Sequence, residues 1–149
     1  MSSVIVSKEI EDKIGEIIAH YDFIKEIGGI LIGAYDKKKS CLKITDMSFP
    51  YSSDLQMRFR FSRKSDGHQE FMDNVWQQSG QTKAYIGEWH THDQDKPSPS
   101  AVDCKTWKRI SAQDNNFKDC FYIIIGRSEY KIWGIQNGEV IEQKGLKDE

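Results

Sequence analysis

The chain has 149 residues, of which 38% are hydrophobic and 30% are charged, and its formal net charge is −2. This length and composition predict one globular domain over residues 1–149, large enough to bury its own core. The small net charge excludes a general basic field that would recruit nucleic acid. No run approaches the roughly 18–20 apolar residues that a membrane span requires.

The three cysteines, Cys41, Cys104 and Cys120, are odd in number and include no CxxC pair. This argues against a disulfide framework and against a zinc site made of thiolates. The first seven residues lack the basic flank and the long apolar stretch of a signal peptide. We therefore expect a reducing, cytoplasmic compartment.

The hydrophobic periodicity predicts interleaved helices and strands. In chain order, we expect a helix over residues 8–20, strands over 28–35 and 41–49, a loop or exposed strand region over 50–67, a helix over 68–79, a strand over 84–92, a helix over 101–112, and strands over 121–125, 130–135 and 140–141. Ser7 is a plausible N-cap for the first helix, and Asn137-Gly138 is a favoured hairpin turn. The interleaving predicts an α/β or α+β domain with a mixed sheet.

Two of the four histidines form His90-Thr91-His92 at the end of a predicted strand. Because side chains alternate along a strand, His90 and His92 are expected to project from the same face. Two imidazoles that point the same way suit a zinc ion. The alternative is a pair of surface histidines, or core histidines that are satisfied by hydrogen bonds.

Asp103 is predicted to lie in the first turn of the helix that follows the Pro/Ser loop. A carboxylate there can reach back to the strand end and supply a third ligand. Three protein ligands with a fourth position left for water is the layout of a catalytic zinc site. The alternative is a capping box, in which Ser100 is the N-cap and Asp103 is its partner at the third helical position. The two interpretations are compatible only in part, since we expect that Asp103 cannot fully serve both.

Glu26 precedes the glycine-containing apolar run that begins at Ile27. A carboxylate at the entry to such a strand lies where backbones approach closely, and it can act as a general base toward a metal-bound water. Glu88 is a rival for this role, because it lies two residues before His90 on the same predicted strand face. The residues alone do not decide between the two glutamates. A third possibility for Glu26 is a solvated charge in the linker between helix and strand.

Together these residues resemble the JAMM motif of MPN-domain metalloproteases. The motif is His90-Thr91-His92, seven residues, Ser100, two residues and Asp103, with Glu26 upstream before Gly-Gly-Ile-Leu-Ile-Gly. The resemblance implies a three-layer MPN/JAB fold, which is cytidine-deaminase-like, with a mixed central β-sheet flanked by helices.

The resemblance also implies a role for each residue of the motif. His90, His92 and Asp103 would hold one zinc ion per chain, and Glu26 would be the general base. Ser100 would help to stabilise the oxyanion that forms during hydrolysis.

The segment from Gly87 to His92 and the sequence Pro97-Ser98-Pro99-Ser100 look most like the short bacterial members of this family. Those members are encoded beside ubiquitin-transfer-like enzymes in antiphage systems, including CBASS. The resemblance implies a zinc-dependent isopeptidase or peptidase that hydrolyses the bond after the C-terminus of a ubiquitin-like protein or CD-NTase conjugate. The expected partner is such a protein with an extended C-terminal tail, without nucleic acid or membrane.

Two features concern the rim of this expected site. Asp93 stands where many members of the family have proline, and Asp93 and Asp95 add negative charge near the metal. We expect this difference to affect the shape of the loop and the substrate rim, and not the zinc ligands. The segment 50–63 is basic and aromatic, and we expect part of a groove there for an extended tail bound as an added strand. The alternative for this segment is plain surface.

Two other functions stay open. The chain could process the tail of a sulfur-carrier protein, which would use the same site. It could instead be a non-catalytic MPN scaffold that binds partners. The scaffold is disfavoured because every ligand residue of the motif is intact.

Overall fold

The computed structural model describes residues 3–49, 55–57, 60–62, 65–80, 82–113 and 119–148. In chain order its elements are β1 (Val4–Val6), α1 (Lys8–His20), β2 (Gly28–Asp36), β3 (Cys41–Met47), β4 (Leu55–Met57), β5 (Arg60–Ser62), α2 (Ser65–Gln78), β6 (Ala84–Thr91), α3 (Ala101–Ser111), β7 (Phe121–Ile125), β8 (Tyr130–Gln136), β9 (Glu139–Gln143) and β10 (Gly145–Lys147).

The predicted helices and strands are confirmed in type and order, and the strands β1 and β10 were not predicted. In the region expected to be loop or exposed strand, β4 and β5 form a separate antiparallel pair, and α2 begins at Ser65. Residues 50–54, 58, 59 and 63 of the expected tail groove lie outside the described residues, so that expectation stays a prediction.

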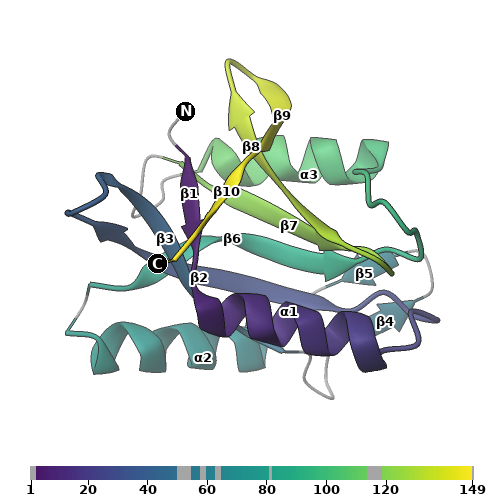
Figure 1. The fold of residues 1–149 in the computed structure, drawn as a ribbon, viewed down its shortest axis with the longest axis horizontal. Coiled ribbons are helices and arrows are strands. Elements are labelled where there is room, and N and C mark those ends of the chain that lie inside the picture. Colours follow the sequence, from purple (N-terminus) through teal and green to yellow (C-terminus); the bar gives the residue numbers. More distant parts are fainter. Residues whose placement is uncertain are drawn as a thin grey trace.

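A mixed sheet forms the centre of the molecule (Figure 1). Its strand order is β10-β1-β3-β2-β6-β7-β8-β9. The pairs β1–β10, β1–β3 and β6–β7 are parallel, and the other neighbours are antiparallel. The architecture is therefore α/β, as the resemblance implied.

The C-terminal segment, β9 followed by β10, contributes a strand to each edge of this sheet. β9 pairs with β8 at one end of the strand order, and β10 pairs with β1 at the other end. Only Lys144 separates β9 from β10 in the chain, so the sheet curls until the C-terminal segment connects its edges.

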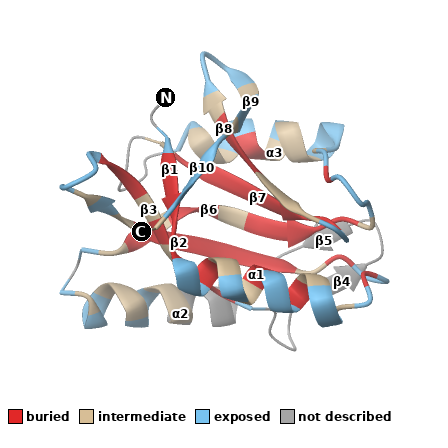
Figure 2. Cartoon of the chain, in the orientation of Figure 1, coloured by how far each residue is buried: buried red, intermediate tan, exposed pale blue. Residues whose placement is uncertain are grey.

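Each face of the sheet packs against its own helix. The side chains Ile10, Ile14 and Ile17 of α1 belong to one buried cluster with alternate residues of β7, namely Phe121, Ile123 and Ile125. On the other face, Trp107 of α3 packs with the intervening residues Cys120, Tyr122 and Ile124. This explains why β7 is a continuous apolar run and is buried over its whole length (Figure 2). The result is three layers, with the sheet between α1 and α3.

Local sequence explains the ends of these elements. The hydroxyl oxygen of Ser7 accepts a hydrogen bond from the backbone N–H of Ile10 at 3.2 Å, which confirms the predicted N-cap of α1. The β8–β9 hairpin turns at Asn137 and Gly138, whose φ angles of 52° and 77° suit the predicted two-residue turn. No described helix is long and apolar enough to cross a membrane. All three cysteines are free thiols, as the odd count predicted.

A bulge at Gly87 sets which face of β6 carries each side chain. The register between β2 and β6 shifts between Leu31 and Ile32, so residues 86 and 88 point to opposite faces. Gly87 has a φ of 153°, and a Cβ atom placed on it would lie 1.6 Å from the carbonyl oxygen of Phe121. A side chain at this position therefore requires β6 and β7 to separate.

We expect Gly87→Ala to lower the free energy of unfolding by about 3 kcal/mol, because the added methyl group meets backbone that cannot move aside. Gly15→Ala is the matched control, since Gly15 lies within α1 and a Cβ atom there meets nothing within 4 Å. The control should gain about 0.5–1 kcal/mol, because glycine is a poor helix former. Urea unfolding measures both, and equal stability of the two variants would contradict this description of β6.

Candidate metal centre

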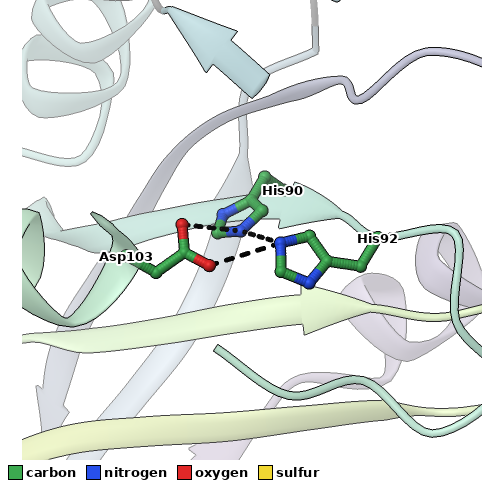
Figure 3. Close-up of side chains that lie close together, drawn as sticks. All are labelled: His90, His92 and Asp103. Atoms are coloured by element: carbon green, nitrogen blue, oxygen red, sulfur yellow. Dashed lines mark hydrogen bonds and ion pairs between the residues drawn. The ribbon is translucent and has the colours of Figure 1, made fainter. Parts of the chain in front are cut away.

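Two histidines converge at the end of β6. His90 and His92 are each 9% exposed, and their ring centroids lie 4.7 Å apart. Their Nε2 atoms are 3.0 Å apart (Figure 3). The alternation along β6 places both rings on the face covered by α3, where the ring of His90 lies 6.2 Å from that of Trp107. The predicted shared face is confirmed.

The N-terminus of α3 brings a carboxylate to the same point. Oδ1 of Asp103 lies 3.4 Å from Nε2 of His90, and Oδ2 lies 3.3 Å from Nε2 of His92 (Figure 3). One ligand atom from each of these three residues lies within 4.8 Å of the others. In the described part of the chain, this is the one group of three or more such residues that could hold a metal ion.

Asp103 also completes a capping box. Its Oδ2 atom accepts a hydrogen bond from the backbone N–H of Ser100 at 2.8 Å, and its own backbone N–H donates to Oγ of Ser100 at 3.1 Å. The cap uses Oδ2, while Oδ1 faces His90. The expectation that Asp103 cannot fully serve both the cap and a metal stays a prediction. The cap also fixes the carboxylate in place, and the Ser100 hydroxyl keeps its proton for donation.

The register between β2 and β6 places Glu26 beside this group. Gly28 pairs with His90, and the backbone N–H of Thr91 donates to the carbonyl oxygen of Ile27 at 2.9 Å. Continuing the antiparallel ladder by one residue sets Glu26 opposite His92. Oε1 of Glu26 lies 3.5 Å from Nε2 of His92, and Glu26 is only 9% exposed. The third interpretation of Glu26, a solvated linker charge, is wrong.

Glu88 has a different partner. The hydroxyl group of Tyr85 donates to Oε2 of Glu88 at 3.1 Å. A regular strand would place residues 85 and 88 on opposite faces, but the bulge at Gly87 brings both to the α3 side. Glu26 thus lies 3.5 Å from His92, whereas the contact described for Glu88 is its hydrogen bond from Tyr85.

Burial and close charges shift the pKa values of this group. Burial opposes ionisation of Asp103, but the hydrogen bonds from His90 and His92 outweigh it, and the pKa of Asp103 lies well below its usual range. Burial raises the pKa of Glu26, which the two imidazoles only partly offset. Burial also disfavours a charged His92, yet the contact with Asp103 and the charge of Glu26 raise the pKa of His92. The carboxylates of Asp103 and Glu26 thus favour the positively charged form of His92.

The donor set fits a catalytic zinc ion. Two imidazole nitrogens and one carboxylate oxygen are typical zinc ligands, and three protein ligands leave a fourth position for water or substrate. Gln94 supports this set, since its Oε1 atom lies 3.2 Å from Nδ1 of His92 and 3.0 Å from the backbone N of Ser98.

The loop that follows β6 is fastened to the β7–β8 turn. The guanidinium group of Arg127 pairs with Asp93 and donates to the carbonyl oxygen of Asp22 at 3.2 Å. The same group lies 5.4 Å from the centre of the Phe23 ring. The negative charge of Asp93, expected near the metal, is thus compensated by the positive charge of Arg127.

Arg127 and Gln94 were not predicted from the sequence. For Gln94 the available signal was a polar side chain two residues after a candidate histidine ligand.

Comparison with known proteins shows the family. The family of prokaryotic homologs of the JAB domain matches residues 11–136. The chain belongs to this JAB family. It is 35% identical over 105 residues to a protein of Vibrio cholerae serotype O1 named CD-NTase/cGAS isopeptidase, covering 70% of this chain and 64% of the relative. A protein of the same name from Pseudomonas aeruginosa is 33% identical over 103 residues, covering 69% of this chain and 64% of that relative. The alignments thus span less than two thirds of these relatives.

Solved structures confirm the JAB fold. A protein from Desulfitobacterium hafniense superposes with a TM-score of 0.66 at 20% identity, covering 98% of this chain and 93% of the other. A JAB1/MPN domain protein from Archaeoglobus fulgidus gives a TM-score of 0.51 at 15% identity, covering 98% of this chain and 100% of the other. At these identities the likeness concerns the fold alone.

Proposed function

We propose that this JAB-family protein is a zinc-dependent isopeptidase that cuts the bond after the C-terminus of a CD-NTase or ubiquitin-like protein, and so reverses its conjugation in CBASS-type antiphage defence. The relatives named CD-NTase/cGAS isopeptidase support the substrate class. The observation that carries the chemistry is the convergence of His90, His92 and Asp103 beside Glu26.

Each residue of the group has a distinct task in this proposal. His90, His92 and Asp103 would hold zinc, which when bound supplies a Lewis acid that lowers the pKa of water and polarises a carbonyl group. Glu26 takes the proton of the attacking water and later gives it to the leaving amine. Its burial suits this role, because a raised pKa brings a carboxyl group closer to neutral pH.

Ser100 has the remaining task. Its Oγ atom already accepts the N–H of Asp103, so its hydroxyl proton is available to the oxyanion that develops on the attacked carbonyl. All atoms of the reaction are then accounted for without a covalent enzyme intermediate. In this proposal none of the three cysteines takes part in the reaction.

We expect one zinc ion per chain in the purified protein, and release of a target protein joined by isopeptide bond to the C-terminus of a CD-NTase. His90→Ala, His92→Ala and Asp103→Ala should each lose most of the zinc and the cleavage, because two remaining ligands hold the metal poorly. Metal analysis and a gel-based cleavage assay measure the two effects. Asp103→Asn is the matched variant, since an amide keeps the shape of the side chain but removes its charge.

The assay also separates the competing functions. A wild-type protein that releases a sulfur-carrier protein fusion but leaves the CD-NTase conjugate intact would replace the proposed substrate class. A wild-type protein without zinc and without cleavage would favour the non-catalytic scaffold.

Glu26→Gln should lower the cleavage rate by roughly 10²–10⁴-fold, the usual effect of removing a positioned general base. Its zinc content should stay near that of wild type, because the three ligands remain. Glu88→Gln is the matched control, and it should lower the cleavage rate far less, since the carboxylate of Glu88 accepts a hydrogen bond from Tyr85. An inactive Glu88→Gln with an active Glu26→Gln would reverse the assignment of the base.

A further inference from the structure

Gln94 makes two contacts through one atom. Its Oε1 atom lies 3.0 Å from the backbone nitrogen of Ser98 and 3.2 Å from Nδ1 of His92. A backbone N–H can only donate, so the atom of Gln94 at this position must be the carbonyl oxygen and not the amide nitrogen. This removes the usual ambiguity between the two ends of a glutamine side chain.

The orientation of Gln94 assigns the direction of one hydrogen bond of His92. An amide oxygen can only accept, so Nδ1 of His92 must be the donor of the shared contact. Nε2, the other ring nitrogen, faces His90, Glu26 and Asp103. Gln94 therefore holds the ring through Nδ1 and leaves Nε2 at the candidate metal position.

We infer that Gln94 is a positioning residue that accepts the Nδ1–H of His92 and so holds the ring with Nε2 toward the metal. This inference rests on the proposed function for the metal. An acceptor for the outer nitrogen of a histidine ligand fixes the ring and raises its basicity.

The backbone of Gln94 is held from two sides. Its N–H donates to the carbonyl oxygen of His92 at 2.8 Å, and its carbonyl oxygen accepts the backbone N–H of Arg127 at 2.7 Å. The adjoining Asp93 pairs with the side chain of Arg127. Through Ser98, the same glutamine also fastens the loop that leads to Ser100. One side chain thus connects a metal ligand with the segment that carries the proposed oxyanion donor.

The test replaces Gln94 and follows both the hydrogen bond of His92 and the metal. Gln94→Met keeps the length of the side chain but removes the strong acceptor, Gln94→Glu keeps an acceptor, and Gln136→Met makes the same change on the exposed β8–β9 hairpin. NMR of the zinc-loaded proteins reports how fast the Nδ1–H of His92 exchanges with water, which a hydrogen bond to residue 94 slows. Competition with a zinc chelator gives the dissociation constant of zinc alone.

We expect wild type, Gln94→Glu and Gln136→Met to show a slowly exchanging Nδ1–H of His92, and Gln94→Met to show faster exchange. The zinc dissociation constant of Gln94→Met should rise about 10–100-fold. Unchanged exchange and unchanged zinc affinity in Gln94→Met would overturn the inference while leaving the proposed function intact. A wild type that binds no zinc would instead overturn the proposed function, and the inference with it.

Discussion

The antiparallel register between β2 and β6 is the constraint on which the site depends. It sets Gly28 against His90, and two residues further along the ladder it sets Glu26 against His92. A Cβ atom on Gly28 would lie 2.2 Å from the carbonyl oxygen of Trp89, so this approach requires glycine. Backbone hydrogen bonds, such as the one between Thr91 and Ile27, thus bring Glu26 and His92 together although they are far apart in the chain.

The other side of the site is built by the start of α3. The capping box orients Asp103 through backbone hydrogen bonds, so the carboxylate is in position before any metal arrives. The loop between His92 and Ser100 is held by Gln94 and, through Asp93, by Arg127. Ligands that are fixed in this way lose little freedom when a metal binds, which favours affinity and a defined geometry.

The sequence predicted most of this fold because its strong signals are local. The apolar period of α1, the continuous apolar run of β7 and the Asn137-Gly138 turn each need only neighbouring residues to be interpreted. The strands β1 and β10 were missed because three residues carry little pattern, and because their existence depends on pairing between the two ends of the chain.

The site was predicted in part for the same reason. His90 and His92 follow from strand alternation, and Asp103 from its place in the first turn of a helix. The choice between Glu26 and Glu88 did not follow from the residues alone, because it depends on the register between β2 and β6 and on the bulge at Gly87. Oδ2 of Asp103 takes part in the cap while Oδ1 faces His90, a division that residue type and spacing alone do not indicate.

X-ray absorption at the zinc edge of the zinc-loaded protein tests the proposed ligand set. A site made of His90, His92 and Asp103 should show imidazole scattering from two histidines, remaining ligands that are oxygens, and a mean ligand distance of about 2.0–2.1 Å. His90→Ala should lose one imidazole from the spectrum. A zinc–sulfur distance of about 2.3 Å, or a spectrum that His90→Ala and His92→Ala leave unchanged, would contradict a site made of His90, His92 and Asp103.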